Sequence, residues 1–137
     1  MSELRFAKIN FLVRDGQAAF DYALNVLGAK VVAEPHEMPI GSVSQVDLHG
    51  LVMEFIQPPR GSRMDGMIDR RGEGMDSVGF ATDDVPGAVK AIEGRGGRFA
   101  QTGDAGLANT AWLHPRNPLS LSIELFNSEL SGSPGQT

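Results

Sequence analysis

A repeat within the chain constrains its fold more than any other feature of the sequence. Residues 8–15, "KINFLVRD", align with residues 77–84, "SVGFATDD", and residues 53–58, "MEFIQP", align with residues 123–128, "IELFNS". Apolar residues alternate along these stretches, which is typical of strands buried on one face. A helical pattern follows the first stretch of each pair. The sequence therefore predicts the α+β class, with two modules that each run strand, helix and three strands.

The first module is predicted over residues 1–58. A strand over 5–13 leads into a helix that starts after Asp15 and ends at Gly28, because aspartate caps helix N-termini and glycine often ends helices. Three strands follow, and His49-Gly50 is predicted to join the last two in a tight turn. These strands are expected over residues 29–35, 41–50 and 51–59.

The second module is predicted over residues 74–127 with the same order of elements. Its helix carries Pro86 in the first turn, and the strands around it are expected over residues 75–82, 98–103, 109–115 and 119–127. Residues 128–137 are predicted to be a disordered tail. Residues 59–73 are predicted to be a linker with four arginines, which are either solvated or bind an anionic group of a substrate. These arginines are Arg60, Arg63, Arg70 and Arg71.

Composition excludes several classes of protein. The 137 residues are 41% hydrophobic and include no cysteine, which rules out disulfides and thiolate metal sites. No apolar run approaches the roughly 20 residues that span a bilayer, and the N-terminus lacks a secretion signal, so a cytoplasmic protein without a membrane partner is expected. A net charge of −5 argues against nucleic acid as a partner. A small molecule is the expected partner, and a homodimer stays open.

Strand alternation divides each predicted strand into two faces. Ile9, Phe11 and Val13 are expected to pack against helices, and the opposite face carries polar and small residues at matched places in both modules. We call this opposite face the polar face. If the modules pair about a pseudo-twofold axis, its residues converge on one curved sheet and form a ligand site; the alternative is a solvent-exposed face. Its expected ligand-site residues are Lys8, Asn10, Glu54, Met75, Ser77, Ser122, Glu124 and Phe126.

Two segments carry a family resemblance. Residues 71–85, "RGEGMDSVGFATDDV", and residues 112–125, "WLHPRNPLSLSIEL", are similar to segments of methylmalonyl-CoA epimerases. Over residues 5–127 the chain resembles the vicinal oxygen chelate superfamily, which includes glyoxalase I, bleomycin-resistance proteins and extradiol dioxygenases. The resemblance implies two βαβββ modules that form a cupped mixed sheet.

The resemblance also implies a divalent metal site, but the chain departs from it. Glu54 and Glu124 occupy the two carboxylate places, whereas Lys8 and Ser77 occupy the two histidine places. The epimerases' other catalytic glutamate falls near Ser44 or Gln45, which we expect to contact substrate instead. An ammonium at a ligand position repels a metal, so no metal and no cofactor are predicted, with Lys8 supplying the positive charge. A metal site completed by other residues stays open. None of His36, His49 and His114 lies at a ligand position, and His114 is expected to make a strand-end contact.

Two functions fit these residues. The first is a metal-independent isomerase, epimerase, lyase or cyclase that acts on a small carbonyl compound. In it Lys8 polarises an oxygen, Glu54 holds Lys8, and a carboxylate, most simply Glu124, moves a proton. The second is a non-catalytic protein that binds antibiotics or metabolites, as bleomycin-resistance proteins do. In either case Trp112 and Phe126 are expected to contact the ligand.

Overall fold

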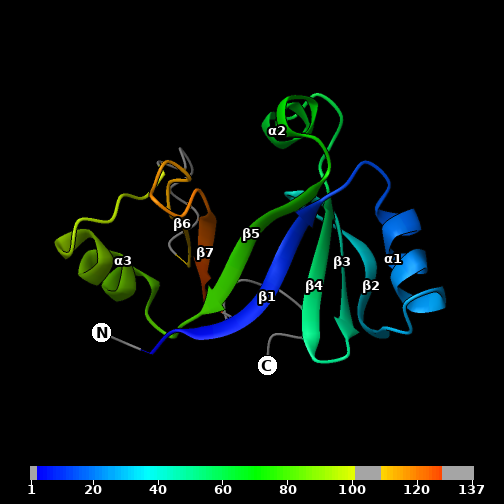
Figure 1. Ribbon diagram of the computed structural model, residues 1–137, viewed down its shortest axis with the longest axis horizontal. Coiled ribbons are helices and arrows are strands. Elements are labelled where there is room, and N and C mark those ends of the chain that lie inside the picture. The colour runs from blue at the N-terminus through cyan, green and yellow to red at the C-terminus, as the bar shows by residue number, and fades with distance from the viewer. Residues whose placement is uncertain (1–2, 101–108, 128–137) are drawn as a thin grey trace. The chain divides into compact units, whose positions relative to one another are not determined.

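The structure is a computed structural model that describes residues 3–100 and 109–127 (Figure 1). The described residues group into two compact units. The first unit is Lys8–Asp76, and the second unit is the described part of Met1–Ala7 and Ser77–Thr137. Each unit combines strands with a helix, so the predicted α+β class is confirmed.

Four strands form the sheet of the first unit, in the order β2-β3-β4-β1. The strands are β1 (Arg5–Leu12, whose first three residues group with the second unit), β2 (Lys30–Met38), β3 (Gly41–Leu48) and β4 (Leu51–Gln57). β1 and β4 are parallel, while β3 pairs antiparallel with both β2 and β4. The predicted turn between β3 and β4 is confirmed, because His49 and Gly50 both have positive φ, of 53° and 103°.

Helix α1 (Gly16–Asn25) covers one face of this sheet. The predicted cap is confirmed, because the Asp15 side chain accepts a hydrogen bond from the Ala18 N–H at 3.0 Å. Phe20 and Ala23 of the helix are buried against Val46 and Phe55 of the sheet. Phe11 and Val13 also pack here, so the predicted helix-facing side of β1 is confirmed for these residues.

The segment predicted as a linker contains a helix, α2 (Arg63–Arg71). Ser62 caps it by accepting a hydrogen bond from the Asp65 N–H at 3.2 Å. Ile68 is buried and Met64 and Met67 pack beside it, which matches the 3–4 residue spacing of an amphipathic helix. The segment is therefore anchored to the first unit by an apolar face.

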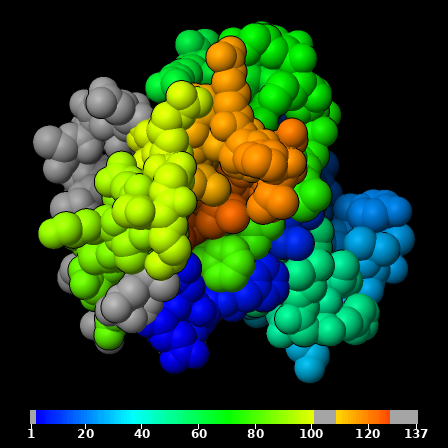
Figure 2. All heavy atoms as spheres, turned by 60° about the vertical axis from the view of Figure 1, so that its left-hand side comes forward, coloured from blue at the N-terminus to red at the C-terminus, as the bar shows by residue number. Residues whose placement is uncertain are grey.

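The second unit has the strand order β5-β7-β6. Its elements are β5 (Gly74–Ala81, whose first three residues group with the first unit), α3 (Val85–Gly94), β6 (Thr110–Trp112) and β7 (Ser122–Phe126). Ala88 of α3 packs on Leu125 of β7, and Figure 2 shows residues 85–100 in yellow-green beside residues 109–127 in orange. Phe6 packs edge-on against Phe80, with ring centroids 6.0 Å apart.

The second copy of the repeat differs from the prediction in one strand. Within the described residues, the segment expected to form a strand over 98–103 contributes only an isolated bridge between Phe99 and Leu113. Most of the remainder of that strand, and the predicted disordered tail at 128–137, lie outside the described residues.

Candidate active site

A row of three polar residues crosses the sheet of the first unit. Asn10 of β1 lies beside Glu54 of β4 in the parallel register, and Gln45 of β3 lies opposite Glu54 in the antiparallel register. We call Asn10, Glu54 and Gln45 the first row. Since paired residues point to the same face of a sheet, all three side chains project from the face that α1 does not cover. The strands thus bring together residues 44 positions apart.

An ion pair joins this row to Lys8, which lies on the same face of β1 two residues before Asn10. The Lys8 Nζ is 3.0 Å from Glu54 Oε1, and Gln45 Nε2 donates to the same oxygen at 2.7 Å. Lys8 is 1% exposed, Gln45 and Asn10 0%, and Glu54 6%. The alternative of a solvent-exposed polar face is therefore wrong for these residues.

Burial makes the pairing of Lys8 with Glu54 energetically important. A carboxylate or an ammonium that is taken out of water loses hydration free energy on the order of several kcal/mol. Only a well-placed opposite charge offsets that loss. Both donors described for Glu54 reach Oε1. Within residues 3–100 and 109–127, Glu54 Oε2 receives no hydrogen bond. Lys8 and Gln45 therefore hold the carboxylate through Oε1, and Oε2 can accept a hydrogen bond from a ligand.

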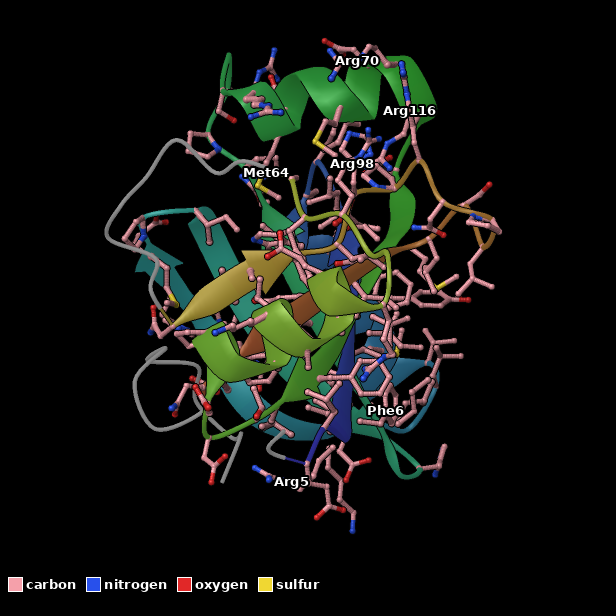
Figure 3. All side chains as sticks on the ribbon, turned by 90° about the vertical axis from the view of Figure 1, so that its left-hand side faces the viewer. Arg5, Phe6, Met64, Arg70, Arg98 and Arg116 are labelled. Atoms are coloured by element: carbon pink, nitrogen blue, oxygen red, sulfur yellow. The ribbon has the colours of Figure 1, made fainter. Side chains whose placement is uncertain are left out.

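An apolar row continues the same face next to the first row. Leu12, Ile56 and Val43 are paired across β1, β4 and β3 and are buried. Helix α2 packs on this apolar row through Ile68 and Met64 (Figure 3). The face therefore changes from polar to apolar along the strands, and α2 covers the apolar end.

Ion pairs from Arg14 fasten α2 to the loop after β1. Arg14 Nη1 is 2.9 Å from Asp65 Oδ1, and Nη2 bonds to Asp69. Asp65 also accepts a hydrogen bond from the Gly61 N–H at 2.9 Å. That backbone hydrogen bond is the main reason why the pKa of Asp65 lies below its usual value; burial opposes the shift, and the charges of Arg14 and Arg60 add to it.

The donors of the first unit do not fit a divalent metal. Glu54 Oε1 already accepts hydrogen bonds from the Lys8 ammonium and the Gln45 amide N–H. The ammonium repels a metal cation, and an amide N–H group cannot bind one. Across residues 3–100 and 109–127, no three histidine, aspartate or glutamate side chains gather as metal ligands would. The described residues of this site therefore do not fit a divalent metal.

Ser44 and Gln45 are neighbours that point to opposite faces. Gln45 belongs to the first row, whereas Ser44 pairs with Phe55 on the face covered by α1. The Ser44 hydroxyl is buried, and its oxygen finds no hydrogen-bond partner within the described residues. Of the two positions predicted to replace a family glutamate, only Gln45 joins Glu54.

The second unit carries an equivalent row around Glu124. Glu124 of β7 pairs with Gly79 of β5 and with Trp112 of β6. We call Gly79, Glu124 and Trp112 the second row. Glu124 is 8% exposed, and Ser77, two residues before Gly79, is fully buried. Ser77 and Glu124 are thus withdrawn from solvent, whereas Trp112 is half-buried.

The other residues predicted to contact a ligand differ in their burial and in their hydrogen bonds. The Ser122 hydroxyl donates to the Leu113 carbonyl at 3.1 Å, and Phe126 is fully buried. Met75 is 62% exposed and lies beside a hollow of about 90 Å³ in the first unit. That hollow is lined by Leu12, Arg71, Gly72, Glu73, Gly74, Met75 and Asp76.

Sequence reasoning missed the residues that α2 brings to the first unit. Met64 and Ile68 are four residues apart, and Ser62 precedes them as a cap, so the helical signal was present. The flanking glycines and prolines, together with the arginines, favoured a linker instead. Of those arginines, Arg71 pairs with Asp76 at 2.6 Å.

None of the described helices is long and apolar enough to cross a bilayer. The sequence profile of the Glyoxalase/Bleomycin resistance protein/Dioxygenase superfamily matches residues 8–112. A comparison with curated protein sequences gives no significant match.

Solved structures with the same fold share little sequence with this chain. A hypothetical protein from Bacillus halodurans C-125 is 15% identical over 96% of this chain and 99% of its own, with a TM-score of 0.79. Streptomyces coelicolor methylmalonyl-CoA epimerase, in complex with 2-nitronate-propionyl-CoA, is 19% identical over 96% and 100%, with a TM-score of 0.74. The Mycobacterium tuberculosis epimerase is 17% identical over 94% and 92%, also with a TM-score of 0.74.

Proposed function

Because this chain belongs to the Glyoxalase/Bleomycin resistance protein/Dioxygenase superfamily, we propose that it is a metal-independent enzyme of the isomerase or lyase type acting on a small carbonyl compound. The observation that carries the proposal is the buried ion pair of Lys8 and Glu54, 3.0 Å apart. The resemblance assigns this region of the fold to a metal that stabilises an oxyanion. A fixed ammonium performs the same electrostatic task.

Lys8 is the electrophile in this proposal. A proton leaves the carbon next to the carbonyl, and the electrons of the C–H bond form a C=C bond while the carbonyl electrons move onto oxygen. The ammonium of Lys8 stabilises the resulting oxyanion, and Glu54 holds Lys8 in place through Oε1. An ammonium has three N–H donors, so bonding to Glu54 is compatible with bonding to a substrate oxygen.

A carboxylate accepts and returns the proton. Sequence equivalence favours Glu124, and the geometry of the first unit adds Glu54, whose Oε2 receives no hydrogen bond from the described residues. Return of the proton to the opposite side of the carbon gives an epimer, and return to a different atom gives an isomer. Loss of a leaving group from the neighbouring carbon gives a lyase reaction. Positioned acid–base groups contribute roughly 10²–10⁴-fold to such steps.

Deuterium incorporation from solvent tests this chemistry. Methylmalonyl-CoA is the first probe, because it is bound in one epimerase structure of the same fold, and simple 2-oxo acids and acyl thioesters complete the panel. We expect the C–H signal next to the carbonyl of one probe to disappear faster with the protein than without it. The rate should fall at least about 100-fold in Glu54→Gln or Glu124→Gln. Unchanged exchange in both variants would contradict the proposal.

A second candidate is a non-catalytic binding protein. The observation in its favour is that Glu54 Oε1 already accepts two hydrogen bonds, so the pair forms a satisfied, static centre. In that case a probe binds with the same affinity to the wild type and to Glu124→Gln, and no probe exchanges. Calorimetric titration of the same panel distinguishes this outcome from catalysis.

A further inference from the structure

Arg98 and Arg116 both contact His114 in the second unit. The backbones of Arg98 and His114 are hydrogen-bonded, with the His114 N–H donating to the Arg98 carbonyl at 2.8 Å. The Arg98 Nη2 is 3.4 Å from His114 Nδ1, and the Arg116 backbone N–H donates to the same nitrogen at 3.0 Å. Figure 3 shows the two arginines at the same end of the unit, away from Arg5.

These two contacts show how the ring of His114 is held. A guanidinium and a backbone N–H are donors only, and both face His114 Nδ1. The second ring nitrogen, Nε2, makes neither of these contacts. The cluster offers a ligand the two guanidinium groups and this second nitrogen of His114.

The positive charge of this cluster has no described counterion. Arg14 and Arg71 each pair with aspartates, whereas Arg98 and Arg116 form no ion pair with any residue in 3–100 or 109–127. Both are exposed.

The connection between β6 and β7 holds the cluster in shape. The Asn117 Nδ2 donates to the carbonyls of His114 and Leu121 at 2.7 and 2.9 Å, and the Leu119 N–H donates to Asn117 Oδ1 at 2.8 Å. These bonds close the loop on both sides of Arg116. A loop fixed in this way presents its donors without a large ordering cost on binding.

We propose that Arg98, His114 and Arg116 form a binding site for an oxyanion group, a phosphate or a carboxylate, of a small molecule. Guanidinium groups match the planar oxygens of both anions through paired hydrogen bonds. The proposal does not depend on catalysis at Lys8, since it concerns binding by different residues.

Titration with pyrophosphate and with succinate tests the site, with ¹H–¹⁵N spectra of the histidine and arginine side chains as the readout at low ionic strength. We expect at least one probe to shift the His114 and Arg98 signals, and the preferred probe distinguishes a phosphate from a carboxylate ligand. The affinity should fall about tenfold in Arg98→Gln and in Arg116→Gln, the loss expected for one charge-assisted hydrogen bond. Arg5→Gln, an exposed arginine of the same unit, should bind as the wild type does.

A separate variant tests the role of the histidine. In His114→Asn the side-chain oxygen replaces the acceptor Nδ1 of the Arg116 N–H bond, whereas the second ring nitrogen, Nε2, is lost. We expect the fold to be retained and the affinity to fall. The proposal is overturned if neither probe shifts these signals, or if Arg5→Gln weakens binding as much as Arg98→Gln does.

Discussion

The two copies of the repeat place a glutamate at the same point of the sheet and surround it differently. In the first row Glu54 has Asn10 and Gln45 as neighbours, and Lys8 neutralises it. In the second row Glu124 lies between Gly79 and Trp112. The strand neighbours of the two glutamates therefore differ: two amide side chains in the first row, and a residue without a side chain and an aromatic ring in the second.

This difference separates the features that the two copies share from those that they do not share. The helix caps Asp15 and Asp84 and the helix-packing residues of the strands are shared. The residues around each glutamate are not shared. If the proposed function holds, these unshared residues are the ones that adapt the two rows to a ligand.

Removal of Lys8 should give the largest effect on stability. Lys8→Met leaves Glu54 buried without its cation, and we expect the free energy of unfolding to fall by about 3–5 kcal/mol. The matched change in the second copy, Ser77→Ala, removes a neutral hydroxyl and should cost about 1 kcal/mol. Urea unfolding of both variants measures the difference.

A double variant sharpens this result. Lys8→Met combined with Glu54→Leu removes both charges, so most of the lost stability should return. If the stability lost in the double variant equals the sum of the losses in the two single variants, the ion pair does not explain why Lys8→Met costs more than Ser77→Ala.

Gly41 lies at the start of β3, close to the backbone of Gln57 at the end of β4. It begins β3 with a φ of 134°, and an added Cβ would lie 2.2 Å from the Gln57 carbonyl oxygen. Gly41→Ala should therefore cost about 3 kcal/mol, through backbone strain and collision. Gly74 begins β5 with a similar φ of 131° but has open space around it, so Gly74→Ala should cost about 1 kcal/mol. Equal losses in thermal unfolding would show that the collision is relieved.

The helix caps test the shared part of the repeat. Asp15 and Asp84 each accept a hydrogen bond at 3.0 Å from the backbone of the following helix. Asp15→Ala and Asp84→Ala should each lower the free energy of unfolding by about 1 kcal/mol. A clear inequality in chemical denaturation would mean that the two helices do not contribute alike.

The smallest expected effect is the pH dependence that Asp65 of α2 contributes. The pKa of Asp65 is lowered in the folded state, so its contribution to stability is present above the unfolded pKa near 3.8 and is lost as the pH falls below that value. Asp65→Asn should therefore flatten the stability profile on the acid side. A profile in Asp65→Asn that falls as steeply as that of the wild type would contradict this assignment.

Much of the fold could be predicted because alternation and caps are local signals. The strands of the first copy, the turn at His49-Gly50 and the cap at Asp15 follow from adjacent residues. The helix α2 was missed because glycine, proline and arginine around it resemble a solvated linker, and only packing on Leu12 and Ile56 shows that it is anchored.

Strand alternation predicts which residues of the site share a face, but not which of them are in contact. Alternation placed Lys8 and Glu54 on one face, and the structure brings their charged atoms within 3.0 Å. The choice between Ser44 and Gln45 depended on register, which the turn after β3 sets and which local patterns do not reveal. The cluster around His114 was not identified, because Arg98 reaches His114 only through contact between segments 16 residues apart.

In the proposed reaction the cation of Lys8 supports proton transfer without a metal. Solvent-deuterium exchange into the responsive carbonyl probe, measured with a strong chelator present for the wild type and for Lys8→Met, tests this role. We expect the chelator to leave the wild-type rate unchanged and Lys8→Met to lose at least about 100-fold, the loss expected on removal of an oxyanion donor. Exchange that the chelator abolishes, or that Lys8→Met retains, would contradict it.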